Sequence, residues 1–330
     1  MPKPTVRSLL LATLALALLT AVPAADAGRV AQAPATQAPA AVAASASTDP
    51  LQAISGEPAA APTANDPSGV AMPVGNVTGW RQVFSDNFPT NVKLGRFSGC
   101  SVGSDLMRSN CKGLPAAVAA KWFAFPGGWK DTAGNGEYEP SQVLSIHNHE
   151  LDFYIHSNSV GTPLVAAPEP KIPGGVAGGG LLYGAYIVRF KANMLPDYKT
   201  AWLLWPDAYD YGVARWPADG EIDFPEANLN ANIGAFMHWQ GATSGQQQDV
   251  YSTNKNYSVW HTAVIEWTPQ MVRFILDGRV IGSATGHIPS TPMHWVLQTE
   301  TATDGAVPAR RTAGHLLVAW VAVYSPRSLL

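Results

Sequence analysis

Three carboxylates lie within a stretch of six residues in a segment that reads WPADGEIDFPE and runs from Trp216 to Glu226. The acids are Glu221, Asp223 and Glu226. Like charges gathered on one strand repel each other, so a purely structural reason for this cluster is hard to find. Repulsion also helps to keep one of two neighbouring carboxyl groups protonated. The cluster therefore indicates acid–base and nucleophilic chemistry of the kind that cleaves a glycosidic bond.

The spacing of these acids makes a demand on the strand that carries them. Side chains alternate along a strand, so Glu221 and Asp223 share a face whereas Glu226 would point away. One extra residue in a β-bulge brings Glu226 back, and Pro225, which cannot donate to a ladder, lies where a bulge is expected. Cleavage with retention needs the two carboxyl groups about 5 to 5.5 Å apart. Same-face positions on a flat strand are roughly 7 Å apart, so we expect a concave sheet.

Spacing alone leaves two other readings of the acid cluster open. The three acids could be solvated residues on an exposed strand edge. Clustered carboxylates are also the ligands that calcium prefers, so a structural calcium site stays possible. We otherwise expect no cofactor and no set of metal ligands, because the sequence contains no zinc-binding signature.

The elements around the cluster are predicted to be strands. Apolar and polar residues alternate with period two, turn signals separate the runs, and no convincing amphipathic helix appears. Asp277-Gly278 between two apolar runs predicts a hairpin, because both residues tolerate positive φ. The expected strands are 142–146, 151–156, 184–192, 200–204, 220–224, 233–239, 261–267, 271–276, 279–282, 293–299 and 316–324. We predict an all-β fold, an antiparallel β-sandwich of the jelly-roll type.

The motifs in this order resemble those of glycoside hydrolase family 16. The bulged branch of that family carries E-x-D-x-x-E, commonly preceded by W-P-x-x-G, and Trp216 to Glu226 fits in register. Two departures are Phe224-Pro225, in place of the usual aliphatic pair, and Trp205 to Arg215, which is longer than expected. The other matching segments are Trp80 to Phe88, Tyr183 to Lys191, Thr200 to Leu204, His238, Trp260 to Pro269, Asp277-Gly278 and Trp320 to Tyr324.

The resemblance implies a concanavalin A-like sandwich with a concave substrate cleft. It implies Glu221 as nucleophile, Glu226 as general acid/base, and Asp223 as a neighbour that assists the protonation state of the nucleophile. The implied function is that of a secreted, retaining endo-β-glycanase, with β-1,3- or mixed-linkage β-glucan as default substrate and galactan-type polymers still open. A cell-wall transglycosylase and a non-catalytic carbohydrate-binding protein of the same fold are the alternatives.

Tryptophans are the candidates for contacts with the sugar, because an indole face covers the apolar face of a pyranose. The resemblance favours Trp216 as a subsite residue. His238 is expected to hydrogen-bond near the nucleophile, although a satisfied core histidine is the alternative. The other candidates, any of which could be core residues because alternation alone does not fix their faces, are Trp202, Trp205, Trp239 and Trp260.

The composition excludes one class of partner. Only 14% of residues are charged and the formal net charge is -3, so the chain lacks the basic surface that nucleic-acid binding needs. We expect a monomer whose partner is a polysaccharide.

The N-terminus has the pattern of a signal peptide over residues 1–27. Basic Lys3 and Arg7 precede an apolar run from Leu9 to Val22, and Ala25-Asp26-Ala27 is a small-x-small cleavage pattern. An uncleaved anchor is the alternative, but the run falls short of the roughly 20 residues that span a bilayer. Residues 28–73, rich in Ala and Pro, are expected to be a disordered linker, with the hydrolase domain at 74–330. The expected location is extracellular or cell-wall associated, without a membrane contact after cleavage.

Two cysteines, Cys100 and Cys111, are expected to form a disulfide in an oxidising compartment. Two unpaired buried thiols are the alternative. A bridge across so short a loop stabilises by about 3 kcal/mol or less, so it would hold a local loop rather than the fold.

Overall fold

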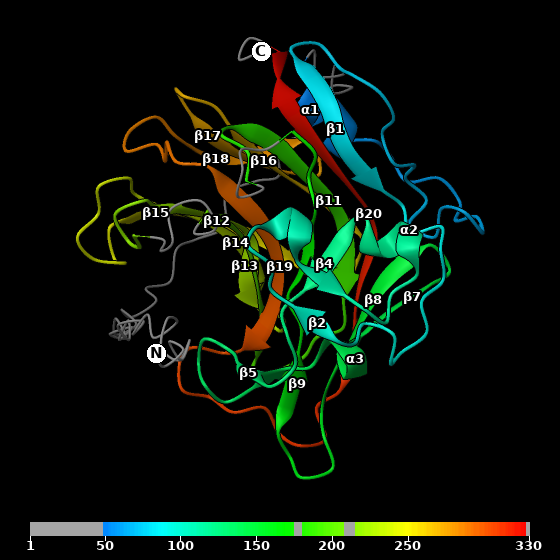
Figure 1. The fold of residues 1–330 in the computed structure, drawn as a ribbon. Helices are drawn as coiled ribbons and strands as arrows, with labels where there is room; N and C mark the ends of the chain where they lie inside the picture. Colours follow the sequence, from blue (N-terminus) through cyan, green and yellow to red (C-terminus); the bar gives the residue numbers. More distant parts are fainter. Residues whose placement is uncertain (1–48, 175–179, 208–214, 328–330) are drawn as a thin grey trace, which may run out of the picture.

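The computed structural model describes residues 49–174, 180–207 and 215–327, which include the sheets and the acid cluster. Strands dominate these residues and form two principal sheets (Figure 1). The predicted all-β sandwich is therefore confirmed. The expected signal peptide lies outside the described residues. Within them, no helix is long and apolar enough to cross a membrane.

The larger sheet has eleven strands within the described residues. They are β1 (Trp80–Asp86), β5 (Trp129–Lys130), β6 (Glu137–Tyr138), β7 (Leu144–His147), β8 (Glu150–Ser157), β9 (Pro163–Val165), β11 (Gly184–Ala192), β16 (His261–Trp267), β17 (Val272–Leu276), β18 (Arg279–Ala284) and β20 (Gly314–Pro326). Their order is β18-β17-β16-β11-β20-β8-β9-β6-β5, with β1 beside β20 and β7 beside β8. The pairing of β6 with β9 is parallel.

The smaller sheet carries the acid cluster on one of its central strands. It consists of β12 (Tyr198–Pro206), β13 (Glu221–Asn228), β14 (Asn232–His238), β15 (Gln248–Asn256) and β19 (Met293–Thr301). The order is β15-β14-β13-β12-β19, and every neighbouring pair is antiparallel. The sheet thus places β13 between β12 and β14, two strands that can support the acids from either side.

Short elements complete the described part of the chain. They are the helices α1 (Pro50–Ser55), α2 (Ala116–Ala119) and α3 (Pro140–Val143), the 3-10 turn η1 (Leu106–Arg108), and the paired strands β2 (Cys100–Ser101) with β3 (Asn110–Cys111) and β4 (Trp122–Ala124) with β10 (Pro168–Pro170). The predicted disulfide is confirmed, since Cys100 and Cys111 are bonded and join β2 to β3. It holds a local loop, as its short span implies.

Apolar alternation explains why the two sheets pack together. Along β11, Tyr186, Val188 and Phe190 point into the core between the sheets, while Ala185 and Ile187 point to the outer face of the larger sheet. Burial of both faces gives β11 a nearly continuous apolar run. The main core contains side chains from both sheets, including the fully buried rings of Trp202, Trp267 and Trp295.

The folded part begins earlier in the sequence than predicted. Asp49 caps α1 by accepting hydrogen bonds from the backbone N–H groups of Leu51 and Gln52. Leu51 and Val70 are buried in a second apolar cluster, which lies on the outer face of the larger sheet together with Trp320. Residues 49–73 therefore cover that face instead of forming a disordered linker. A few well-spaced apolar side chains outweigh the Ala- and Pro-rich composition on which the linker prediction depended.

Replacing Leu51 by Ala is expected to destabilise the protein by about 2 to 5 kcal/mol, the usual cost of a cavity left by a buried leucine. Urea unfolding followed by tryptophan fluorescence would measure this loss. Leu94, which is 51% exposed, provides the matched control, and Leu94→Ala is expected to change stability little. Equal stability of the wild type and Leu51→Ala would contradict the packing of α1 on the sheet.

Candidate active site

The three acids share one face of β13 because the strand contains one extra residue. The three-residue step from Asp223 to Glu226 faces a two-residue step from Phe236 to Gly234 on β14. The same shift appears against β12. This irregularity lies at Phe224-Pro225, where the β-bulge was predicted. Because Ile222 and Phe224 point into the core, the acids point to the opposite, outer face of the smaller sheet.

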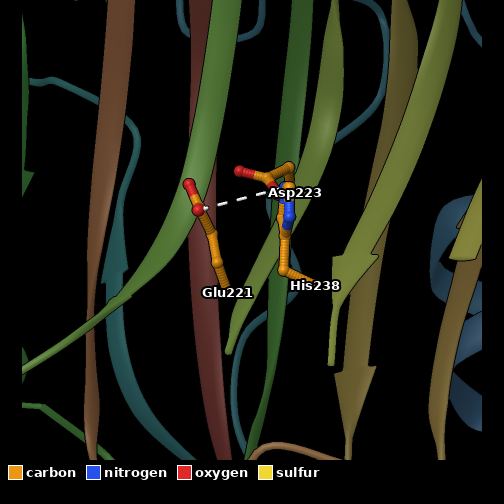
Figure 2. Close-up of side chains that lie close together, drawn as sticks. All are labelled: Glu221, Asp223 and His238. Carbon is orange, nitrogen blue, oxygen red and sulfur yellow. Dashed lines mark ion pairs between the residues drawn. The ribbon is translucent and has the colours of Figure 1, made fainter. Parts of the chain in front are cut away.

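Glu221, Asp223 and His238 converge on this face (Figure 2). His238 is paired with Glu221 across the β13–β14 ladder. Its Nε2 lies 3.6 Å from Asp223 Oδ2 and 4.0 Å from Glu221 Oε2. The other ring nitrogen, Nδ1, lies 3.0 Å from the carbonyl oxygen of Gly245, and donation there fixes the orientation of the ring. The structure thus brings His238 beside the acids, and its hydrogen bond near the nucleophile stays a prediction.

Burial and mutual repulsion set the protonation of the two adjacent acids. Burial raises the pKa of Asp223 well above its ordinary value, and the charges of Glu221 and Glu226 raise it further. Burial also raises the pKa of Glu221, but less, because His238 and hydrogen bonds from Asp223 and Trp216 favour its ionised form. Because its pKa is raised more, Asp223 is the member of the pair that keeps a proton more readily than Glu221. The assisting role that the resemblance implied for Asp223 stays a prediction.

Glu226 has a different partner, which the sequence reasoning missed. Lys199 on β12 places its Nζ 2.6 Å from Glu226 Oε1 and 3.4 Å from Oε1 of Glu300 on β19. Burial lowers the pKa of Lys199, but the charges of Glu226 and Glu300 outweigh this effect and raise it above its ordinary value. Lys199 is therefore a buried ammonium beside Glu226. The available signal was a lysine and a glutamate in two strands that also carry many apolar residues.

Two tryptophans form an aromatic wall beside Glu221. Nε1 of Trp216 donates to Glu221 Oε2 at 2.7 Å, and the Trp216 ring stacks near that of Trp205 with centroids 6.3 Å apart and planes at 18°. A Cβ at Gly245 would lie 2.4 Å from the Trp216 ring, so only glycine permits this close approach. Both tryptophans thus lie beside Glu221, and their contact with a sugar stays a prediction. Residues 208–214, most of the long segment noted in the sequence, lie outside the described residues.

For two tryptophans, Trp202 and Trp260, the predicted contact with a sugar is wrong. Trp202 is fully buried between the sheets and packs edge-on against Phe190. Trp260 packs with the second apolar cluster on the outer face of the larger sheet and lies against Lys191, so it is on the wrong side of the molecule. Trp239 stacks on His287 and packs partly against the main core, and its contact with a sugar stays a prediction.

The acid cluster is also where a metal ion would find ligands. Among the described residues, Glu221, Asp223 and His238 form the one group of three such side chains whose ligand atoms all lie within 4.8 Å of one another. Calcium takes six to eight oxygen ligands, and this group offers two carboxylates and an imidazole. A carboxylate beside a protonated acid is suited to nucleophilic and proton-transfer chemistry without such an ion.

Known proteins share both the sequence pattern and the fold. The model of the family described as glycosyl hydrolases family 16 matches residues 179–321. A β-glucanase of Rhodothermus marinus is 31% identical over 106 residues, covering 29% of this chain and 35% of that protein. The clotting factor G alpha subunit of Tachypleus tridentatus is 24% identical over 168 residues, covering 46% of this chain and 25% of that protein. The chain therefore spans about a third or less of these two relatives.

Solved structures agree with the fold over most of the described chain. The laminarinase of Rhodothermus marinus superposes with a TM-score of 0.55 and 22% identity, covering 75% of this chain and 98% of that one. An endo-1,3-β-glucanase of Streptomyces sioyaensis gives a TM-score of 0.55 and 18% identity, covering 77% of this chain and 99% of that one. Together, the family model shows that residues 179–321 match glycosyl hydrolases family 16, and the solved structures show that the chain shares their fold.

Proposed function

We propose that this protein is a retaining endo-β-glycanase in which Glu221 is the nucleophile and Glu226 the general acid/base. The observation that carries the proposal is the arrangement on β13, where the bulge brings Glu221, Asp223 and Glu226 to one face and burial raises the pKa of Asp223 more than that of Glu221. Retention requires two carboxyl groups with these separate roles at one glycosidic bond.

In the first step, a carboxylate oxygen of Glu221 attacks the anomeric carbon. A glycosyl ester bond forms as the glycosidic carbon–oxygen bond breaks, and the leaving oxygen takes its electron pair together with the proton of Glu226. Trp216 Nε1 donates a hydrogen bond to Glu221, which holds the attacking carboxylate in place. The products of this step are the released end of the chain, the glycosyl-enzyme and an ionised Glu226.

In the second step, Glu226 acts as a base. Its carboxylate accepts a proton from water as the water oxygen attacks the anomeric carbon. The ester bond breaks, its electron pair returns to Glu221, and the enzyme regains its starting protonation. Two inversions at one carbon leave the sugar with its original configuration.

The proposed substrate is a β-1,3- or mixed-linkage β-glucan. The relative of Rhodothermus marinus is described as a β-glucanase, which supports this default for the matching part of the chain. The aromatic wall of Trp205 and Trp216 beside Glu221 supports stacking on a pyranose ring. We also propose export from the cell, supported by the N-terminal pattern and by the disulfide, and N-terminal sequencing of protein from the culture medium would test it.

A polysaccharide panel tests the proposed function directly. Purified protein would be incubated with laminarin, mixed-linkage glucan, galactans and agar-type polymers, and the products followed by mass and reducing ends. We expect internal cleavage of a β-glucan into short oligosaccharides. Products longer than the donor would instead indicate transglycosylation. Binding without cleavage of any polymer would overturn the enzymatic proposal in favour of a carbohydrate-binding protein.

The pH dependence of kcat/KM should report the pKa of Glu221 and the influence of Asp223 on it. Because the pKa of Glu221 lies above its ordinary value of 4.5, kcat/KM is expected to fall as the pH drops through a value above 4.5. Asp223→Asn keeps a neutral donor beside Glu221, so activity should stay within about tenfold of wild type. Asp223→Ala removes a hydrogen bond that lowers the pKa of Glu221, so the acid limb should move to higher pH. Identical profiles for the two variants would contradict a donating Asp223.

A further inference from the structure

Lys199 is the cationic partner of the proposed acid/base in the described structure, and it is enclosed by protein. The exposed fractions of the side chains are 11% for Lys199, 18% for Glu226 and 2% for Glu300. All three lie on the acid-bearing face. Lys199 pairs with Glu300 across the β12–β19 ladder. Ala201, two residues along β12 and so on the same face as Lys199, pairs with Glu226. Water therefore screens the ammonium on Glu226 only weakly.

Glu300 holds the ammonium in a fixed position. Its Oε2 accepts a hydrogen bond of 2.9 Å from Gln298, and its neighbour Thr301 is tied to Asp131 through both its backbone N–H and its hydroxyl. These bonds anchor the end of β19. Glu300 also offsets the charge of Lys199. The buried ammonium therefore has two carboxylate partners, Glu226 and Glu300.

The position of this ammonium fits the charge changes of the proposed reaction. Glu226 becomes a carboxylate at the moment its proton reaches the leaving oxygen, and it stays a carboxylate until water returns a proton. A fixed positive charge stabilises an anion that forms in the transition state, and it does so most strongly at a site that excludes water. Lys199 Nζ, 2.6 Å from Glu226 Oε1, is close enough to act in this way and to orient the carboxyl group.

We propose that Lys199 is a positioning residue for Glu226, with Glu300 as its counter-ion, and that it promotes proton transfer to the leaving sugar. This inference rests on the proposed function. It assigns Lys199 no contact with the substrate. Its effect on the rate must therefore depend on how much protonation the leaving group needs, whereas a lysine that merely supports the fold would affect all substrates alike.

Aryl β-glycosides of the preferred sugar, with leaving groups of different acidity, separate these two roles. For a phenyl leaving group, which needs protonation, Lys199→Met is expected to lower kcat/KM by about 100-fold. For a dinitrophenyl leaving group, which departs without a proton, the loss should stay within about threefold. The slope of log kcat/KM against leaving-group pKa therefore becomes steeper. Lys199→Arg, which can span the same two carboxylates, should restore part of the loss for the phenyl substrate.

Lys191→Met is the matched control, because Lys191 lies against Trp260 away from the acids and its loss should leave the slope unchanged. Circular dichroism and thermal melting would establish that each variant is folded. An active wild type whose Lys199→Met variant loses the same factor for every leaving group, or loses nothing, would overturn this inference alone. A wild type inactive on every glycoside and polymer would overturn the proposed function and this inference with it.

Discussion

Glu221→Gln is expected to lower hydrolysis of the preferred β-glucan by at least about 10⁴-fold, because it removes the carboxylate that forms the glycosyl ester in the proposed mechanism. The amide keeps the shape of the side chain and its hydrogen bond from Trp216, so binding of the polymer should persist. Initial rates from reducing ends, together with a binding assay on the same polymer, would separate the loss of chemistry from a loss of affinity.

Glu57→Gln is the matched control for this change, since Glu57 is exposed and lies in the N-terminal segment, away from the acids. Its activity should equal that of wild type. The covalent intermediate gives a second, independent readout. A dinitrophenyl glycoside should load the sugar onto Glu221 in a Glu226→Ala protein, where hydrolysis of the ester is slow, and peptide mass spectrometry would locate it. Residual activity of Glu221→Gln near that of wild type would remove Glu221 from the role of nucleophile.

Local sequence rules were sufficient for the acids on β13. Period-two alternation placed Glu221 and Asp223 together, and the missing N–H of Pro225 located the one residue that brings Glu226 to the same face. These are properties of a single strand, so a single segment of sequence contains them. The roles assigned to the three acids depended on the family resemblance and remain to be tested.

The partners of Glu226 could not be predicted in the same way. Lys199 and Glu300 lie on β12 and β19, and they meet Glu226 only through the registers of two ladders that join distant parts of the chain. Alternation gives the relative faces within a strand, but it does not say which strands are neighbours or how they are aligned. A charged residue in an apolar strand is a usable signal, yet it does not identify the partner.

The same limit explains the errors with the tryptophans and the N-terminal segment. Both faces of several strands are buried here, so Trp202 and Trp205 on β12 look alike in sequence although one is in the core and the other beside Trp216. Composition, averaged over residues 28–73, hid the few apolar side chains around Leu51 that cover the larger sheet. The outer face of the larger sheet is buried by this segment because the side chains of β11 that point outward are apolar.

Glu226→Ala is expected to produce the second large effect, and one whose size depends on the substrate. For the polymer, whose leaving sugar needs a proton, the rate should fall by about 10² to 10⁴-fold. A dinitrophenyl glycoside should still form the glycosyl-enzyme, so the first turnover appears as a burst followed by slow hydrolysis. Stopped-flow release of dinitrophenolate would measure both phases. Similar losses for both substrates, without a burst, would contradict the role of Glu226 as acid/base.

The configuration of the product formed with azide shows from which face of the sugar the second nucleophile attacks in the Glu226→Ala protein. The truncated side chain leaves room for this small anion, which needs no base and can attack the anomeric carbon of the glycosyl-enzyme where water would. A carbon–nitrogen bond forms, the ester bond breaks, and its electron pair returns to Glu221. Azide should therefore accelerate turnover of the Glu226→Ala protein and yield a β-glycosyl azide, identified by NMR. An α-glycosyl azide would indicate a single displacement and would contradict a covalent intermediate on Glu221.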